Sequence, residues 1–216
     1  LENMNKVLLH TLSAIISISI LGLLQGCANS QPVPSDSFYR LAIQPVKQSE
    51  YNSIPISGIL SISRFSTDAL HSERPMLYTE DDSGLILNQY HYHHWIDSPA
   101  NMIQEQMVRY FQDSGALQNV YTSGTTNSYD YLLKGKLFRF ERVVGSSSRV
   151  DIELEINFLK KSAQENILSR RYKKEIPVNG DSMHDVVTHF NNGLSEIFSL
   201  MLNDIGSYCR ISQKCN

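Results

Sequence analysis

Residues 149–160 constrain the fold more than any other stretch, because apolar and polar side chains alternate there from position 149 to position 158. In an extended chain one face carries Val150, Ile152, Leu154, Ile156 and Phe158, and the other carries Asp151, Glu153, Glu155 and Asn157. A strand of this pattern has one buried and one solvated face, which is typical of an antiparallel sheet covered on one side. The run 129–143 and the turn residues 145–148 complete a predicted hairpin.

The strands beside this one carry two further signals. In the first strand of the hairpin the apolar phase shifts from Leu133 and Leu137 to Phe138 and Phe140, which predicts a β-bulge. A third strand, residues 167–176, is rich in Arg and Lys. Its charges are expected to pair across strands with the acidic face of residues 149–160. The alternative is an anion-binding site on the same basic side chains.

Two earlier segments also predict strands. Residues 54–65 are rich in β-branched side chains and indicate a central strand. One face of it is expected to carry Ile56, Gly58, Leu60 and Ile62. Residues 76–78 and 85–95 flank Asp81-Asp82-Ser83-Gly84, whose residue types favour a turn, so they predict a second hairpin.

Two helices are expected to cover the sheet. Ser98-Pro99 is a typical helix start and Gly115 a typical stop. Between them the buried stripe is Ile103, Met107, Tyr110 and Phe111. Ser182 and Asp185 approximate a capping box before a helix of more than twenty residues that ends near Ile205. The prediction is an α+β fold, in which an antiparallel β-sheet has two helices packed on one face as a two-layer sandwich.

The amino-terminal segment predicts export. Residues 1–26 contain a positive charge at Lys6, an apolar run and small residues at a cleavage site, which is the arrangement of a signal peptide. Residues 1–3 precede Met4, which is the expected start of the protein. Leu23-Leu24-Gln25-Gly26-Cys27 resembles the bacterial lipobox, which implies that Cys27 carries lipid. The alternative is that residues 7–24 are not removed and remain as a membrane anchor. The segment is long enough for this, because a membrane-spanning helix needs at least about 17 apolar residues.

Composition limits the nature of the mature chain. Residues 27–37 are polar with two prolines and are expected to be a flexible tether that extends to roughly 30 Å. Residues 38–216 are enough for one periplasmic domain with its own core. The formal charge of −3 is unaffected by removing Glu2 and Lys6, and it argues against a nucleic-acid partner, which requires clustered cations.

The three cysteines fit an oxidising compartment. With Cys27 used for lipid, Cys209 and Cys215 remain, separated by a short stretch of chain. We expect a disulfide between them, because such bonds persist outside the cytoplasm. A metal-binding pair is the alternative, although no histidine or further cysteine lies near them in the sequence.

The histidine-rich run 90–95 is the most unusual composition in the chain. His91 and His93 share a face of an extended chain and lie beside His94, but two ligands are only half of a zinc site. His184 and His189 lie at the wrong interval for the paired histidines of a zincin helix. Neither a phosphate-binding glycine loop nor a nucleophile elbow occurs in the sequence. We therefore expect no catalytic residues, no metal and no cofactor other than lipid on Cys27.

Two segments carry a family resemblance. Residues 72–78 (SERPMLY) and 90–99 (YHYHHWIDSP) resemble the ABC-type transport auxiliary lipoproteins of the PqiC-like type, and the similarity extends over about residues 38–205. The resemblance implies an outer-membrane lipoprotein that works with an MCE-domain protein and its inner-membrane transporter. An envelope scaffold lipoprotein of another class, in lipopolysaccharide assembly or the activation of cell-wall synthases, is the alternative. A metal-binding or hydrolytic lipoprotein is a third hypothesis.

The segment from Arg74 to Trp95 is the expected contact surface, either for that partner or for a second copy of the chain. Aromatic and Arg side chains dominate protein interfaces, which favours Arg74, Tyr90, Tyr92, His93 and Trp95 as contact residues. The core of the same segment is expected to include Leu85 and Leu87. The alternative for Trp95 is that it packs under the first helix.

Overall fold

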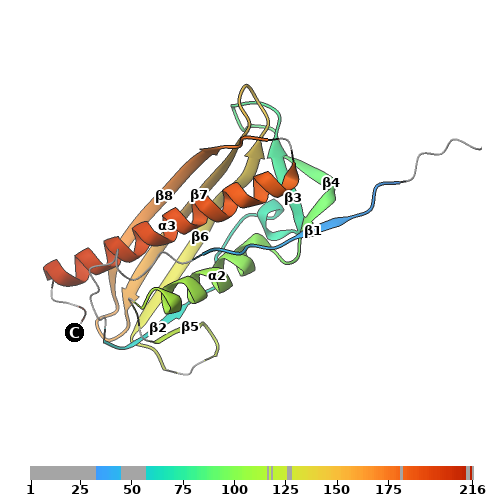
Figure 1. The fold of residues 1–216 in the computed structure, drawn as a ribbon. Coiled ribbons are helices and arrows are strands. Elements are labelled where there is room, and N and C mark those ends of the chain that lie inside the picture. The colour runs from blue at the N-terminus through green and yellow to red at the C-terminus, as the bar shows by residue number, and fades with distance from the viewer. Residues whose placement is uncertain are drawn as a thin grey trace, which may run out of the picture. The chain divides into compact units, whose positions relative to one another are not determined.

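The computed structural model describes residues 33–44, 57–115, 117, 119–125, 128–180, 182–212 and 215. Cys27 and the signal segment lie outside these ranges. The unit from Asp36 to Asn216 contains one open mixed sheet covered by two helices, which confirms the predicted α+β fold (Figure 1). The strands are β1 (Ser37–Tyr39), β2 (Ile59–Ile62), β3 (Pro75–Thr79), β4 (Asn88–Trp95), β5 (Asn119–Thr122), β6 (Tyr131–Val143), β7 (Arg149–Lys160) and β8 (Glu165–Pro177).

The strands β6, β7 and β8 form the predicted antiparallel meander. β6 and β7 pair over almost their full length, with the expected irregularity between Leu137 and Arg139. β8 pairs with the other edge of β7, and Arg171 reaches both Glu153 and Glu155 at 3.2 Å. The basic side chains of β8 therefore pair across strands in part, as the sequence indicated.

The other edge of β6 is shared by two strands placed end to end. β2 pairs in parallel with the start of β6, where Leu60 faces Tyr131, and β3 pairs in parallel with its end, where Leu77 faces Glu141. β5 lies outside β2, while β4 and then β1 lie outside β3. The sheet is thus mixed, whereas the sequence predicted an antiparallel one.

The parallel pairings arise because the chain does not reverse between β2 and β3. Residues 63–69 run alongside the middle of β6, where the Ser66 N–H donates to the Gly135 carbonyl at 2.9 Å and the Leu137 N–H donates to the Ser66 carbonyl at 2.8 Å. A 3-10 turn, η3 (Leu70–Ser72), then leads into β3. Both strands therefore meet β6 in the same direction.

The two helices begin near the residues that the sequence indicated. α2 (Pro99–Asp113) starts after Ser98, whose hydroxyl accepts a hydrogen bond from Arg64 at 3.2 Å instead of capping the helix. α3 (Met183–Ser212) starts after Ser182, whose hydroxyl oxygen accepts from the Asp185 N–H at 3.1 Å. That bond is the first half of a capping box.

The core lies between the sheet and the helices, which are in front of the strands in Figure 1. The rings of Phe140 and Phe190 lie 4.3 Å apart, and Trp95 packs against both. Tyr110 of α2 meets Phe198 of α3 at 5.5 Å, so the two helices share one core. The helical stripe predicted from the sequence is buried: Ile103, Met107, Tyr110 and Phe111.

The chain end is closed by a disulfide between Cys209 and Cys215, whose Cα atoms lie 5.2 Å apart. Both cysteines are buried, so the bond holds the last described residue against the end of α3. Within the described ranges, none of the helices is both long and apolar enough to cross a membrane.

Candidate contact surface

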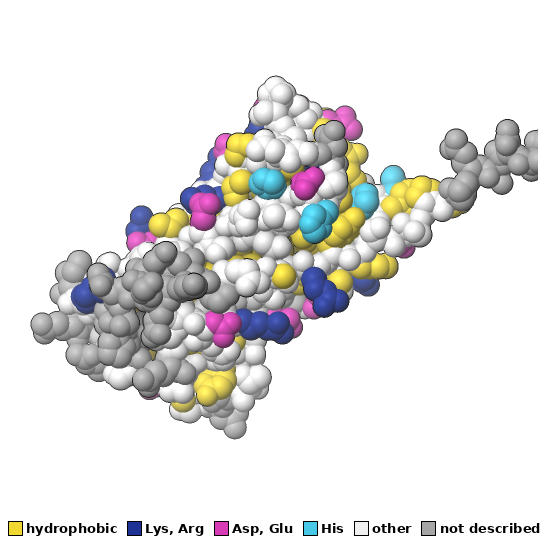
Figure 2. Space-filling model, viewed as in Figure 1, with side chains coloured by type: hydrophobic (Ala, Val, Ile, Leu, Met, Phe, Trp, Pro, Cys, Tyr) yellow, Lys and Arg dark blue, Asp and Glu magenta, His cyan; other side chains and the backbone are white. Residues whose placement is uncertain are grey.

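An exposed surface lies where β1 joins the edge of the sheet. β1 pairs in parallel with β4, which sets Phe38 opposite His94. The two rings stack at 5.6 Å, and the Arg74 guanidinium lies 5.2 Å from the centre of the Phe38 ring. We call Phe38, Arg74, Tyr92 and His94 the edge surface. Figure 2 shows His and apolar side chains side by side in the region of β1.

The edge surface is accessible. Phe38 is 55 % exposed and Tyr92 is 39 % exposed, while Arg74 is also exposed. Arg74 is held in place because its Nε donates to the Trp95 carbonyl at 3.2 Å. A cation and aromatic rings fixed on a strand edge can bind a protein partner without further ordering, which lowers the entropic cost of association.

Behind the edge surface lies a half-buried row of rings. The Tyr39 hydroxyl and His93 Nδ1 are 3.0 Å apart, and Tyr90 lies 5.6 Å from His93 and 4.4 Å from Tyr78. Burial lowers the pKa of His93, with the neighbouring His94 adding to the effect, and burial raises the pKa of Tyr90. His93 and Tyr90 are therefore neutral near pH 7, and they support the edge strands more than they contact solvent.

Trp95 is a core residue. It is 1 % exposed and its ring lies 5.4 Å from Phe140 and 5.5 Å from Phe190. The proposed contact role for Trp95 is therefore wrong. The alternative correctly made it a core residue but placed it under the first helix, whereas its ring packs against Phe190 of the second helix, α3. The physical reason is its place at the end of β4, where the strand enters the layer between sheet and helices.

A buried charge network lies on the opposite face of the sheet. Glu141 and Asp151 face each other across β6 and β7. Arg139 binds both carboxylates, at 2.9 Å and 3.3 Å, and Arg149 Nε reaches Asp151 at 3.0 Å. The sequence placed Asp151 on a solvated face, but it is 1 % exposed because the two arginine side chains cover it. Burial raises its pKa, although both arginines act in the opposite direction.

His71 joins this network to η3. Its Nε2 lies 3.3 Å from Glu141 and its Nδ1 lies 2.9 Å from Asp68. Burial opposes protonation of His71, but the hydrogen bonds to Glu141 and Asp68 outweigh it and raise the pKa of the imidazole. The network therefore fastens the segment between β2 and β3 to the sheet, and its charges are mutually compensated.

Comparison with known proteins decides the family. The model of the ABC-type transport auxiliary lipoprotein component matches residues 39–200. The chain belongs to this family. It is thus an auxiliary lipoprotein component of ABC-type transport, as the sequence resemblance indicated.

Solved structures share the fold of this auxiliary lipoprotein. A protein of Xanthomonas campestris is 19 % identical, with a TM-score of 0.72, and the match covers 82 % of this chain and 99 % of that one. An uncharacterized protein is 11 % identical with a TM-score of 0.61, covering 80 % of this chain and 99 % of its own. At these identities the likeness concerns the fold alone. No curated protein matches the chain.

The histidines of the auxiliary lipoprotein do not assemble a metal site in the described part of the chain, where no three His, Cys, Asp or Glu side chains lie close enough to hold an ion. His91 is exposed and His93 is engaged with Tyr39. His94 Nε2 approaches the His91 carbonyl at 3.1 Å, so the three rings serve different contacts.

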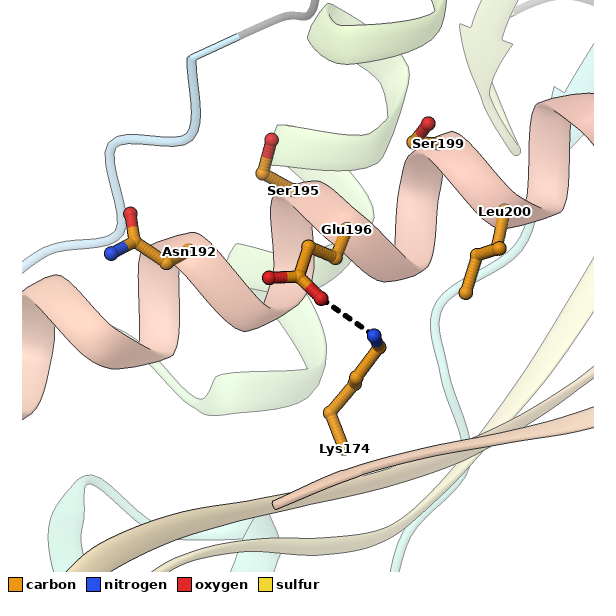
Figure 3. Close-up of a pocket in the computed structure, with 6 residues that line it drawn as sticks. All are labelled: Lys174, Asn192, Ser195, Glu196, Ser199 and Leu200. Carbon is orange, nitrogen blue, oxygen red and sulfur yellow. Dashed lines mark hydrogen bonds and ion pairs between the residues drawn. The ribbon is translucent and has the colours of Figure 1, made fainter. Parts of the chain in front are cut away.

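A groove of about 490 Å³ between α3 and β8 is lined by polar side chains and by Leu200 (Figure 3). Lys174 of β8 is paired with Glu196 of α3, and the Ser195 hydroxyl donates to the Gln44 carbonyl at 3.1 Å. The two charged groups are paired with each other and Ser195 is bonded to the backbone, so the groove of the auxiliary lipoprotein offers a surface depression rather than an array of reactive groups.

Sequence reasoning found Arg74 and Tyr92 but missed Phe38 and His94. The missing information was the pairing of β1 with β4, which brings together residues more than fifty positions apart. The aromatic residues at the start of the domain were the available signal. A short parallel pairing of that kind has no local pattern that predicts it.

Proposed function

We propose that this protein is a non-catalytic, lipid-anchored subunit of the outer membrane that assists an ABC transporter and an MCE-domain protein in moving lipids across the periplasm. The observation that carries the proposal is the family match over residues 39–200, which begins shortly after the lipobox-like residues 23–27. The MCE-domain partner and the lipid cargo rest on the resemblance of residues 72–78 and 90–99 to the PqiC-like type.

Anchoring depends on Cys27. One acyl chain binds a membrane only marginally, so stable attachment requires more than one, as bacterial lipidation supplies. Ala28 follows the cysteine, whereas Asp in that place is the usual retention signal for the inner membrane in enteric-type sorting. Cys27→Ser is expected to move the protein from the membrane to the soluble periplasmic fraction. If the variant still sediments with membranes, residues 7–24 are a true anchor.

The edge surface is the proposed contact with the MCE-domain partner. Arg and aromatic side chains are the types that carry most binding energy in interfaces. Phe38 and Tyr92 lie on β1 and β4, the two outermost strands of one edge, and Arg74 directly precedes β3, the next strand. The proposed role requires no cofactor other than the lipid on Cys27.

A photo-crosslinking amino acid in place of Tyr92 tests the partner directly in cells. The matched control is Tyr121 on β5, because the two tyrosines are 39 % and 40 % exposed. β5 lies at the far end of the strand order from β1. We expect crosslinks to an MCE-domain protein from position 92 and markedly fewer from position 121, as identified by mass spectrometry.

Other outcomes reassign the function. Crosslinks from position 92 to components of lipopolysaccharide assembly or cell-wall synthesis would make the protein an envelope scaffold of another class. Crosslinks to a second copy would make the edge surface a self-assembly interface. Equal labelling from Tyr92 and Tyr121 would show that the edge surface is not selective.

A further inference from the structure

The loop between β3 and β4 exposes two adjacent aliphatic side chains. Leu85 is 86 % exposed and Ile86 is 66 % exposed. The sequence interpretation placed Leu85 and Leu87 in the core. The structure contradicts this for both, because Leu85 is exposed and Leu87 is only half-buried, outside the core. Large aliphatic side chains that extend this far from a folded domain mark a contact surface when they gather in one place.

The loop that carries these side chains is held by specific bonds. The Asp81 carboxylate accepts hydrogen bonds from the Ser83 N–H at 2.9 Å and the Gly84 N–H at 3.1 Å. The Asp82 carboxylate is bound by Arg149 at 2.7 Å and by the Ser146 hydroxyl at 2.6 Å. The Arg149 side chain continues to buried Asp151, so the loop is fastened to the charge network of the sheet.

A third aliphatic side chain lies on the turn between β6 and β7. Val144 is 40 % exposed, and its N–H donates to the Thr79 carbonyl at the end of β3 at 2.8 Å. The bonds from Asp82 to Ser146 and Arg149 join the same two loops. We call Leu85, Ile86 and Val144 the apolar tip.

We propose that the apolar tip inserts into the surface of the membrane that holds the lipid of Cys27, and so sets the orientation of the domain on that membrane. The inference rests on the proposed lipidation of Cys27. Its chemistry is that of a bilayer contact, because the tip presents aliphatic side chains without the Trp, Tyr and Arg that dominate protein interfaces.

The length of the tether agrees with this arrangement. The distance from the start of the domain to the tip is limited by the chain between them. Ser37 pairs with His93, and the eight or so residues from His93 back to Leu85 span at most about 29 Å. The ten residues between Cys27 and Ser37 reach at most about 36 Å when extended. The lipid and the apolar tip can therefore occupy the same membrane surface at the same time.

The charges beside the tip select the kind of membrane surface. Hydrogen bonds to Ser83 lower the pKa of Asp81, and those to Ser146 and Arg149 lower the pKa of Asp82, so both carboxylates remain ionised near the tip. The charge of Asp82 is compensated by Arg149 at 2.7 Å, so Asp81 is the carboxylate that decides the response to membrane charge. Carboxylates repel an anionic bilayer. The preferred surface is therefore a zwitterionic one, such as phosphatidylethanolamine or phosphatidylcholine.

Fluorescence quenching tests the insertion with the full lipidated chain in phosphatidylcholine vesicles. The protein has one tryptophan, buried Trp95, whose signal is measured in the unmodified chain and subtracted. Leu85→Trp adds a reporter at the tip, and Leu200→Trp on α3, where the side chain is 44 % exposed, is the matched control. Brominated acyl chains are expected to quench the Leu85→Trp signal at least twofold more than the control signal. Equal quenching would overturn the proposal.

A second measurement separates the tip from the lipid. The mature chain, residues 27–216, with Cys27→Ser is mixed with phosphatidylcholine vesicles and is expected to bind weakly through the tip. Adding Leu85→Ser with Ile86→Ser should reduce the bound fraction several-fold. If these serines change nothing, the tip is not a membrane contact. If the wild-type chain expressed in cells is not lipidated, the proposed anchoring through Cys27 fails. This second measurement would still show whether the apolar tip binds a membrane, because it does not depend on the lipid. Crosslinking of position 85 to a protein, with no response to vesicles, would assign the tip to a protein partner instead.

Discussion

Replacing Trp95 with alanine should destabilise the domain strongly. The indole is 1 % exposed and packs against Phe140 and Phe190, so its removal leaves a cavity that two rings line. Truncation of a buried Trp costs about 3–5 kcal/mol, and each aromatic pair adds about 0.5–1.5 kcal/mol beyond its buried area. We expect about 4–5 kcal/mol. In a domain of this size 1 kcal/mol shifts the Tm by about 2–4 °C, which predicts a fall of about 8–20 °C.

Differential scanning calorimetry of the mature chain measures this fall. Trp95→Phe keeps a ring in the site and should lose less than half as much stability. Tyr92→Ala is the surface control and should change the unfolding free energy by less than about 0.5 kcal/mol. If Trp95→Ala melts like the wild type while partner binding is lost, the assignment of Trp95 to the core is refuted.

Three further predictions concern other sites. The folded-state pKa of His71 lies above its unfolded value of 6.5. The contribution of His71 to the free energy of unfolding is therefore fully present below that pH and is lost as the pH rises through the folded-state pKa. In urea titrations the stability advantage of the wild type over His71→Gln should accordingly shrink between pH 6 and 9. Cys209→Ser with Cys215→Ser should cost about 2 kcal/mol, and thiol labelling of the unfolded, unreduced mature chain should find no free cysteine. Gly135→Ala drives a methyl group into the Phe65 ring and should cost about 1–3 kcal/mol by thermal melting, with partial recovery on adding Phe65→Leu.

Local patterns predicted the elements of this fold well. The alternation in residues 149–160 corresponds to β7, the Ser98-Pro99 start corresponds to α2, and the long apolar stripe after Ser182 corresponds to α3. Each of these signals resides in neighbouring residues, where the period of the apolar side chains distinguishes helix from strand. The hairpin of β3 and β4 around residues 81–84 was predicted for the same reason.

Long-range contacts account for what the sequence did not predict. The parallel pairing of β2 and β3 with β6 depends on segments that approach from far along the chain. Asp151 is buried because Arg139 and Arg149 cover it, and Leu85 is exposed because its loop is bonded to the sheet by acidic side chains. Polarity alone predicts that Asp151 is exposed and that Leu85 is buried. It fails for both residues because it does not show which partners the tertiary structure brings to each side chain.

The shared edge of β6 has a consequence for how the chain is made. β2 and β3 leave the ribosome before the strand that joins them, because β6 begins at Tyr131. At 5–20 residues per second, the roughly 50 residues between the end of β3 and the start of β6 take about 3–10 s to synthesise. During that time the β3–β4 hairpin has an open edge that can pair with another chain. Nascent chains stalled before Tyr131 should therefore be the species most prone to aggregation and most dependent on a chaperone.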